Sequence, residues 1–344
     1  MSPMRIGSVC TGYGGLDAAV QEVFGGSLAW VADNDPGAAR ILAHHHPQVL
    51  NLGDITAVDW REAEPVDMLI GGYPCQPFSS AGKRKGVADA RHIWPHIATA
   101  LGVLRPRYAV FENVAGHLSL GFDTVLTDLA ALGCDAEWCT LRADEVGAAH
   151  QRKRLFLLAR LADPGSPGLA RWRAKGAASH GGVPPGHSPG FGEREPADQT
   201  HALAGERDAR QVPGRGGGGA AADADRNGRE EQQRSEPGLG TRGDPDGRGP
   251  QRWGPYTAAI ERWAQVIGRP APRPTDDLGR LNPPFVEWLM GLPTGHVTAV
   301  PDLSRSAQLK ALGNGVLPHQ GTAALRHLAA RMGADLGHGM GVAA

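Results

Sequence analysis

The feature that most restricts the fold of this chain is the alternation of short apolar runs with amphipathic segments across its first 160 residues. Short, continuous apolar runs predict buried strands, and the longer segments between them have the periodicity of helices. Strands and helices that alternate in this way predict an α/β fold with a doubly wound, mostly parallel sheet. Ligands in such a fold bind at the carboxyl ends of the strands. Strands are expected at 5–9, 28–32, 68–70, 108–111 and 155–159, and helices at 16–24, 36–45, 93–104 and 122–132.

The middle of the chain has a different composition. Residues 163–250 contain few large apolar side chains and are rich in glycine and proline. Such a segment buries too little apolar surface to offset its conformational entropy, so we predict a low-complexity, disordered insert. Apolar order returns at Trp253, and helices are expected at 283–290 and 317–330. The chain is therefore expected to divide into a core at 1–162, the insert at 163–250, a short segment at 251–280, a part at 281–330 that rejoins the core, and a tail at 331–344.

The charge balance and the cysteine count exclude some classes of protein. With 35 Lys and Arg against 36 Asp and Glu, the formal net charge is −1, which argues against a globally basic, non-specific nucleic-acid binder. A local basic cleft remains compatible with this balance. No apolar run approaches the ~20 residues that a membrane span needs, and the first residues lack the features of a secretory signal. Four cysteines in 344 residues do not indicate a disulfide framework. We therefore expect a soluble, cytoplasmic protein that does not contact a membrane.

A glycine-rich loop follows the first expected strand. It reads Thr11-Gly12-Tyr13-Gly14-Gly15 and opens the first helix, so its backbone can approach a ligand closely. Asp33 ends the second strand, where an acid can bind the two hydroxyls of a ribose, and Asp54 follows a third strand or turn. Together these residues predict a cofactor that contains adenosine. The loop matches neither GxGxxG nor GxxxxGK[ST], which argues against a dinucleotide or a nucleoside triphosphate, and the alternative is an ordinary strand-to-helix turn.

A cysteine loop is the sharpest feature of the sequence. Cys75 lies in Gly72-Tyr73-Pro74-Cys75-Gln76-Pro77, directly after the strand that ends at Ile70. The basic run Lys83-Arg84-Lys85 would favour a thiolate and attract phosphate. The alternative is a small buried cysteine, but a loop at the carboxyl end of a strand is a poor place to bury one.

In these two loops and in its later motifs, the chain resembles the cytosine-5 DNA methyltransferase family of the bacterial and phage type. The family's motifs occur in their usual order as Pro74-Cys75-Gln76, Phe111-Glu112-Asn113-Val114, Gln151-Arg152-Lys153-Arg154, the segment 281–293, and Ala311-Leu312-Gly313-Asn314-Gly315-Val316. The resemblance covers residues 5–160 and about 253–330. It implies an S-adenosylmethionine-dependent methyltransferase with a Rossmann-like sheet and a small target-recognition region.

The resemblance also implies a mechanism. The Cys75 thiolate would add to carbon 6 of a flipped-out cytosine, so that carbon 5 can accept the methyl group of S-adenosylmethionine. Glu112 would bond ring N3 and the exocyclic amine, Arg154 would hold O2 of the base, and Arg152 would support the site from beside it. The sequence does not identify the base that removes the proton from carbon 5.

For the cofactor, the resemblance places Asp33 on the ribose, Asp54 near the adenine amine, and the glycine loop with Pro74 beside the methionine part. Two departures stand out: Cys10 occupies a position where many members have a phenylalanine that stacks on adenine, and Asp33 replaces a commoner Glu. The expected cofactor-binding residues are Thr11, Gly12, Tyr13, Gly14, Gly15, Asp33, Asn34, Asp54, Ile55, Pro74, Trp94, Asn314 and Val316.

Double-stranded DNA is the expected partner, with or without a cognate restriction endonuclease. The segment at 251–280 is the candidate target-recognition segment. The protein is expected to act as a monomer in the cytoplasm of a bacterium or of a phage-infected host.

We expect no metal site, because the consecutive helical residues His44–His46 point in different directions and Cys134 and Cys139 lack a zinc spacing. The expected DNA-binding residues are Ser79, Lys83, Arg84, Arg91, Arg252 and Arg262.

Two other functions compete with this one. A transfer-RNA cytosine-5 methyltransferase shares the catalytic motifs, but the chain lacks a Cys-Phe-Thr segment of the kind found in that subgroup. A catalytically silent DNA-binding relative would fit the sparse recognition region, although Cys75, Glu112, Arg152 and Arg154 are all present.

Overall fold

The computed structural model of the chain describes residues 3–74, 93–161 and 253–334. All of them belong to one of the two units into which the chain divides, which comprises residues 1–190 and 243–344. The predicted insert at 163–250 lies outside the described residues.

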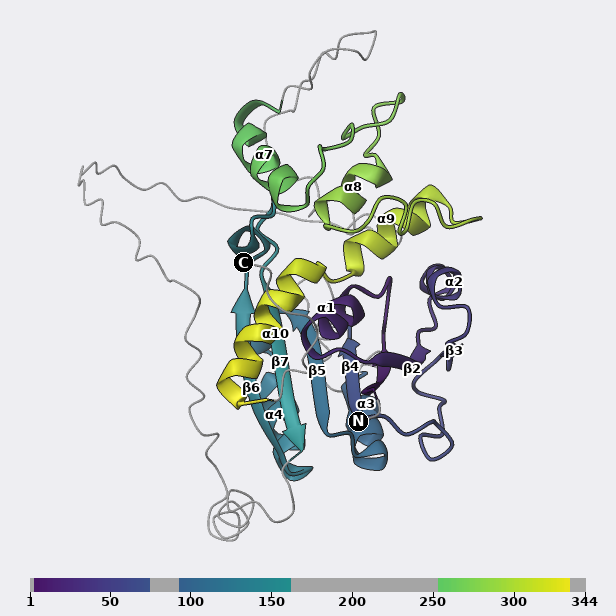
Figure 1. Ribbon diagram of the computed structural model, residues 1–344. Coiled ribbons are helices and arrows are strands. Elements are labelled where there is room, and N and C mark those ends of the chain that lie inside the picture. The colour runs from purple at the N-terminus through teal and green to yellow at the C-terminus, as the bar shows by residue number, and fades with distance from the viewer. Residues whose placement is uncertain (1–2, 75–92, 162–252, 335–344) are drawn as a thin grey trace, which may run out of the picture. The chain divides into compact units, whose positions relative to one another are not determined.

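A seven-stranded sheet forms the centre of the described part of the chain, in the order β3-β2-β1-β4-β5-β7-β6 (Figure 1). The first five strands in this order are parallel, and β7 runs antiparallel to both β5 and β6. The prediction of a doubly wound, mostly parallel sheet is therefore confirmed. The strands are β1 (Arg5–Val9), β2 (Ser27–Ala32), β3 (Leu50–Asn51), β4 (Met68–Gly72), β5 (Tyr108–Val114), β6 (Cys134–Leu141) and β7 (Arg154–Leu161).

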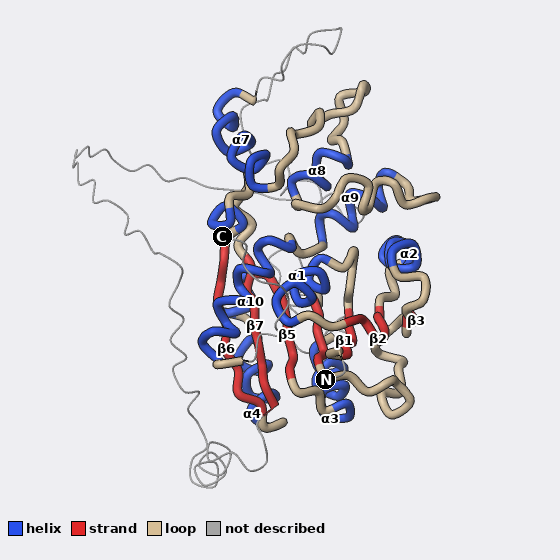
Figure 2. The backbone as a smooth tube through the Cα atoms, viewed as in Figure 1, coloured by secondary structure: helices blue, strands red, loops and turns tan. Residues whose placement is uncertain are grey.

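Helices cover both faces of this sheet (Figure 2). In α2, Asp35 caps the helix by accepting hydrogen bonds from the backbone amides of Gly37 and Ala38, and Pro36 fills the first turn. The helices are α1 (Gly15–Phe24), α2 (Pro36–His45), α3 (Trp94–Leu104), α4 (Phe122–Ala131), α7 (Thr257–Val266), α8 (Pro283–Leu289), α9 (Arg305–Asn314) and α10 (Pro318–Met332). Short 3₁₀ helices lie at Ala115–Ser119, Ala143–Val146 and Gly254–Tyr256.

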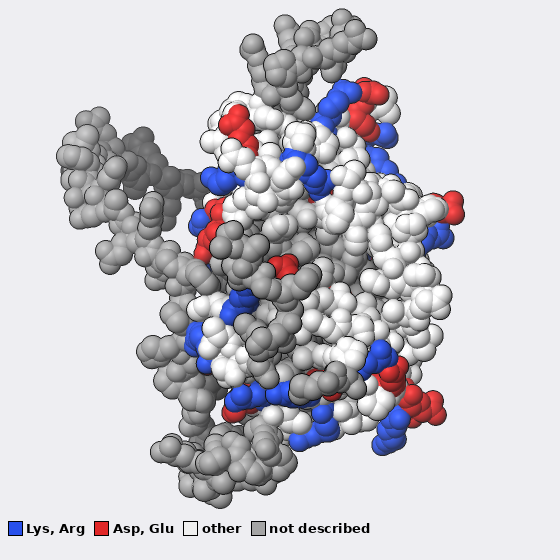
Figure 3. Space-filling view, viewed as in Figure 1, with Lys and Arg blue, Asp and Glu red and all other residues white. Residues whose placement is uncertain are grey.

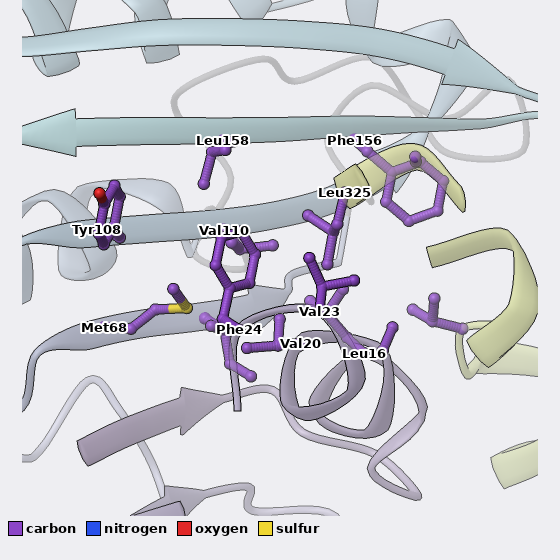
Figure 4. Packing of buried hydrophobic residues seen from close by; sticks show 14 of the residues in the cluster. Leu16, Val20, Val23, Phe24, Met68, Tyr108, Val110, Phe156, Leu158 and Leu325 are labelled. Atoms are coloured by element: carbon purple, nitrogen blue, oxygen red, sulfur yellow. The ribbon is translucent and has the colours of Figure 1, made fainter. Parts of the chain in front are cut away.

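The alternation of side chains along β5 and β7 separates the two faces of the core. On one face, Val110 and Phe156 pack against α1 and α10, with Leu16, Val20 and Leu325 contributed by these helices (Figure 4). On the other face, the intervening residues of the two strands pack with α3 and α4. Helix α10 comes from the C-terminal segment of the chain and packs beside α1 on this face.

Strand β6 and helix α9 are among the elements that were not predicted from the sequence. The first five residues of strand β6 are all partly or fully exposed, and only Cys139 and Leu141 in it are buried, so it lacks the continuous apolar run that identified the other strands. Helix α9 buries only Leu312 and has no apolar stripe. The helices expected at 283–290 and 317–330 are confirmed as α8 and α10.

Among the described residues, no helix combines the length and the hydrophobicity that a membrane crossing requires. In the same part of the chain, no three His, Cys, Asp or Glu side chains are arranged to hold a metal ion.

Candidate active site

A cavity of about 490 Å³ opens at the carboxyl ends of β1, β2, β4 and β5. Its volume lies within the ~300–1,000 Å³ of small-molecule sites. Lys310, Ala311 and residues 313–316, at the end of α9 and directly after it, complete its wall. Eleven of the residues expected in the site lie on this wall: Thr11, Gly12, Asp33, Asn34, Asp54, Ile55, Pro74, Glu112, Arg154, Asn314 and Val316.

The glycine loop is tied to the end of β2 by Asp33. The backbone amide of Gly12 donates to one carboxylate oxygen of Asp33 at 2.8 Å, and the amide of Asp35 donates to the other at 2.9 Å. Gly12 and Gly14 both have positive φ (59° and 83°), a conformation that a side chain would strain. Burial raises the pKa of Asp33, while the two backbone amides oppose the shift. Asp33 therefore positions the loop and also faces the cavity.

Polar residues at the edge of the cavity continue from Asp33. The Asn34 amide donates to the Asp54 carboxylate at 3.1 Å, and the backbone and hydroxyl of Thr56 donate to the same carboxylate. Hydrogen bonds from Thr56 hold the pKa of the exposed Asp54 below its usual value. This edge therefore offers fixed acceptors to the hydroxyls and amines of a nucleoside.

A buried ion pair lies on another part of the same wall. Arg154 Nε is 2.9 Å from Glu112 Oε1, and the two side chains are only 18% and 9% exposed. Because β7 is antiparallel to β5, Arg154 at the start of β7 lies beside Val114 at the end of β5. Burial raises the pKa of Glu112 to about 7, and the positive charges of Arg154 and Arg152 only partly offset this effect. Glu112 can therefore carry a proton near neutral pH.

Arg152 lies behind the wall, not on it. Its guanidinium donates to the carbonyl oxygens of Gly313 at 3.0 Å and Gly315 at 2.7 Å. Gln320 in turn donates to the carbonyl of Arg152 at 2.9 Å. Arg152 thus holds in place the turn that carries Asn314 and Val316.

Four other residues of the expected cofactor set are not on the wall. Tyr13 is buried and donates its hydroxyl to the carbonyl of Val316 at 2.7 Å. Trp94 is buried and donates to the Asp128 carboxylate at 2.8 Å, and its neighbour Ile93 lines the cavity instead. Gly14 and Gly15 lie in the turn into α1, away from the lining. These residues shape the site from behind.

The turn that leads to Cys75 is held by buried polar contacts. The Asn113 amide donates to the carbonyl of Tyr73 at 3.1 Å, and the Tyr73 hydroxyl lies 2.9 Å from Nε2 of His117. Pro74 then reaches the cavity wall. The expected residues Cys75, Ser79, Lys83, Arg84, Arg91 and Arg252 lie outside the described residues.

Several residues that shape the site were not predicted. Lys310 pairs with Asp35 at the cavity wall and so joins α9 to the start of α2. Asp17 lies on the wall as a buried carboxylate, in a position that sequence periodicity presents as an ordinary helix residue. Cys10 also lies on the wall, and burial raises its pKa to about 12, so it remains a neutral thiol. The expected DNA contact Arg262 projects from α7 and approaches the carbonyl of Gly147 at 3.5 Å.

The fold and the cavity define an α/β protein with a ligand site at the carboxyl edge of its sheet. Residues 4–171 match the family model for the C-5 cytosine-specific DNA methylase. The match assigns this segment a similarity to C-5 cytosine-specific DNA methylases, as its motifs predicted.

Individual relatives agree with this assignment. The chain is 33% identical over 134 residues to the Type II methyltransferase M.NgoBV of Neisseria gonorrhoeae. This aligned segment covers 36% of this chain and 32% of that protein. It is 37% identical over 167 residues to the orphan methyltransferase M.Rho11sI of Bacillus phage rho11s, covering 46% and 33%. The matches thus span about a third of the length of these relatives. The crystal structure of the S. pombe Dnmt2 methyltransferase shares the fold, with a TM-score of 0.56, 16% identity, and coverage of 96% of this chain and 99% of that one.

Proposed function

We propose that this protein transfers a methyl group from S-adenosylmethionine to carbon 5 of a cytosine in a specific sequence of duplex DNA. The observation that carries the proposal is the buried Glu112–Arg154 pair on the wall of the cavity that also contains Asp33. A nucleoside-binding edge and a carboxyl group suited to a pyrimidine ring thus share one space. Cys75 follows Pro74 of the same wall directly in the chain.

The residues present fit S-adenosylmethionine. Asp33 and Asp54 would accept hydrogen bonds from its ribose and its adenine amine, while Asn314 and Val316 would close the opposite side. The cavity also contains a buried carboxylate, Asp17, which suits a ligand that carries positive charge. When bound, the cofactor supplies the methyl group.

The chain's own residues would then act on the cytosine. The Cys75 thiolate forms a bond to carbon 6, and the electrons of the double bond between carbons 5 and 6 become available at carbon 5. Glu112, with a pKa of about 7, can hold a proton against ring N3 and so offset the charge that develops there. Arg154 fixes the Glu112 carboxyl and can donate to O2 of the base. Loss of the proton from carbon 5 and departure of Cys75 restore the aromatic ring.

This chemistry requires the base to leave the helix. Glu112 is only 7% exposed, so a cytosine stacked in a duplex could not reach it. Flipping the base into the cavity costs a few kcal/mol, which contacts to the DNA backbone must offset. On the face shown in Figure 3, the described basic and acidic side chains are interspersed, so this face presents no uniformly basic field. We therefore assign DNA contacts to the local groups Ser79, Lys83, Arg84, Arg91, Arg252 and Arg262, and target recognition to residues 251–280.

The test is transfer of labelled methyl from S-adenosylmethionine to duplex DNA and, separately, to transfer RNA, followed by sequencing of the modified sites. We expect labelled 5-methylcytosine in DNA, none in transfer RNA, and no transfer by Cys75→Ala, which should still bind the cofactor. DNA with 5-fluorocytosine at the target should form a covalent complex with the wild type alone, because fluorine blocks the final elimination. Turnover by Cys75→Ala would refute the mechanism. Label in transfer RNA would favour the alternative enzyme, and DNA binding without transfer would favour a silent relative.

The proposal extends to the setting of the protein. It includes action as a monomer in the cytoplasm of a bacterium or of a phage-infected host, with or without a cognate restriction endonuclease. The bacterial and phage origins of the relatives named Type II and orphan methyltransferases support the choice of host.

A further inference from the structure

One buried carboxylate in the cavity is not used by the mechanism above. Asp17 lies in the first turn of α1, its residue is only 3% exposed, and it contributes to the cavity wall. The Ser8 hydroxyl and the backbone amide of Asp17 lie close enough to interact with this carboxylate, but neither its two oxygens nor the Ser8 hydroxyl makes a hydrogen bond of regular geometry with a described residue. Buried polar groups in folded proteins are almost always paired, so an unpaired carboxylate on a cavity wall calls for a ligand that pairs with it.

The surroundings of Asp17 favour a cationic ligand. Burial raises the pKa of Asp17 to about 6, the Ser8 hydroxyl and the backbone amide of Asp17 oppose the shift, and the charge of Asp33 adds to it. At neutral pH the group is therefore still mostly ionised, and it is surrounded by more negative than positive charge. The other charged residues of the cavity wall are Asp33, Asp35, Asp54, Glu112, Arg154 and Lys310, and Arg154 and Lys310 already pair with Glu112 and Asp35.

The order of the strands places Asp17 between the two ends of the site. Asp33 follows β2 and Glu112 ends β5, while α1 begins after β1, which lies between β2 and β4 in the sheet. A ligand that extends from a ribose at Asp33 towards a base at Glu112 must pass the start of α1. The only cationic group of S-adenosylmethionine that does not take part in methyl transfer is the ammonium of its amino-acid part.

We propose that Asp17 binds the α-ammonium group of S-adenosylmethionine and so selects the complete amino-acid part of the cofactor. This proposal rests on the proposed function and assigns a further positioning residue to it. Asp17 makes a charge-assisted hydrogen bond to the ammonium, which supplies the partner that the carboxylate otherwise lacks. Because the ligand binds the ionised form, cofactor affinity rises as Asp17 loses its proton.

The test compares two ligands that differ in the amino-acid part. S-adenosylhomocysteine contains the ammonium, and 5′-methylthioadenosine keeps the nucleoside and the sulfur but lacks the amino acid. Calorimetry on the full chain should show that Asp17→Asn weakens binding of S-adenosylhomocysteine by about tenfold or more and leaves binding of 5′-methylthioadenosine within about twofold. The matched control is Glu22→Gln, an exposed acid on the same helix that pairs with Arg326, which should change neither affinity.

The pH dependence gives a second measurement. With a pKa of about 6, Asp17 is ionised to about 10% at pH 5 and about 90% at pH 7. The affinity of the wild type for S-adenosylhomocysteine, relative to that for 5′-methylthioadenosine, should therefore rise by nearly tenfold over this range, and the ratio should be flat in Asp17→Asn. An unchanged ligand ratio in Asp17→Asn would overturn the assignment. If the wild type binds neither ligand, the proposed function itself fails, and the assignment of Asp17 fails with it.

Discussion

The substitution Gly315→Ala tests how the C-terminal turn is joined to the glycine loop. A Cβ atom at Gly315 would lie 1.9 Å from Cε1 of Tyr13 and 2.3 Å from Cζ of the same ring. Gly315 has a φ of −76°, which any residue adopts, so the effect comes from space alone and not from backbone strain. The ring cannot move away freely, because Tyr13 is 2% exposed and its hydroxyl donates to the carbonyl of Val316.

The cost can be worked out from these contacts. Overpacking of a filled core costs about 1–3 kcal/mol, and loss of the Tyr13 hydroxyl bond adds about 1 kcal/mol. Gly315→Ala should therefore lower the free energy of unfolding by about 2–4 kcal/mol. Tyr13→Phe, which loses only the hydroxyl bond, should lower it by about 1 kcal/mol. Cofactor affinity should also fall in Gly315→Ala, since Tyr13 belongs to the glycine loop and Val316 lines the cavity.

The assays are denaturant unfolding and calorimetric titration with S-adenosylhomocysteine. The matched control is Gly313→Ala, two residues away in α9, where an added Cβ would meet no atom within 4 Å. This variant should be neutral or more stable by up to about 1 kcal/mol, because alanine favours a helix. The reasoning is refuted if Gly315→Ala unfolds at the same denaturant concentration as Gly313→Ala and binds the ligand equally well.

Three further predictions follow from the site and from the sequence. Asp33→Ala should weaken S-adenosylhomocysteine binding by about tenfold or more and leave DNA affinity nearly unchanged; equal calorimetric affinities would reject a ribose role for Asp33. Because the pKa of Glu112 is raised to about 7 in the folded state, the folded protein binds the extra proton, and its free energy of unfolding should fall by roughly 3 kcal/mol as the pH rises from about 4.5 to about 7. Glu112→Gln should lack this part of the slope in denaturant unfolding, and an identical slope would contradict the burial argument. Replacing Ser166–Asp246 with a short Gly/Ser linker should leave cooperative thermal unfolding and cofactor binding intact, whereas loss of cooperativity would mean that this stretch supports the fold.

Sequence patterns predicted the parallel part of the fold well because its strands are buried on both faces. Residues 68–70 and 108–111 appear as unbroken apolar runs, and both lie at the centre of the sheet. Strand β6 lies at the edge of the sheet and is partly exposed along most of its length, so a search for continuous apolar runs could not find it. Helix α9 was missed because only Leu312 in it is buried, so its sequence has no apolar stripe of the kind that identifies a helix.

The motifs predicted which segments meet at the site but not what each side chain does there. Trp94 was expected at the cofactor, yet α3 directs it into the core, where it bonds Asp128, and Ile93 faces the cavity. Asp17 was not expected there, because an acid in the first turn of a helix is common for reasons of helix capping and dipole alone. Only three-dimensional packing shows that this acid is buried and makes no hydrogen bond of regular geometry with the described residues.

Arg152 explains why the late motif must fold back onto the early ones. It lies two residues before β7, and its φ of 25° is unusual for a residue with a side chain. This conformation accompanies two hydrogen bonds from its guanidinium to the carbonyls of Gly313 and Gly315, more than 150 residues later in the chain. Those carbonyls flank Asn314, and Gly315 in turn touches Tyr13 of the first loop. Arg152 therefore fixes the C-terminal turn from behind, and the turn contacts the first loop, so movement of Arg152 or of the turn must change the shape of the cavity that the turn and the loop line.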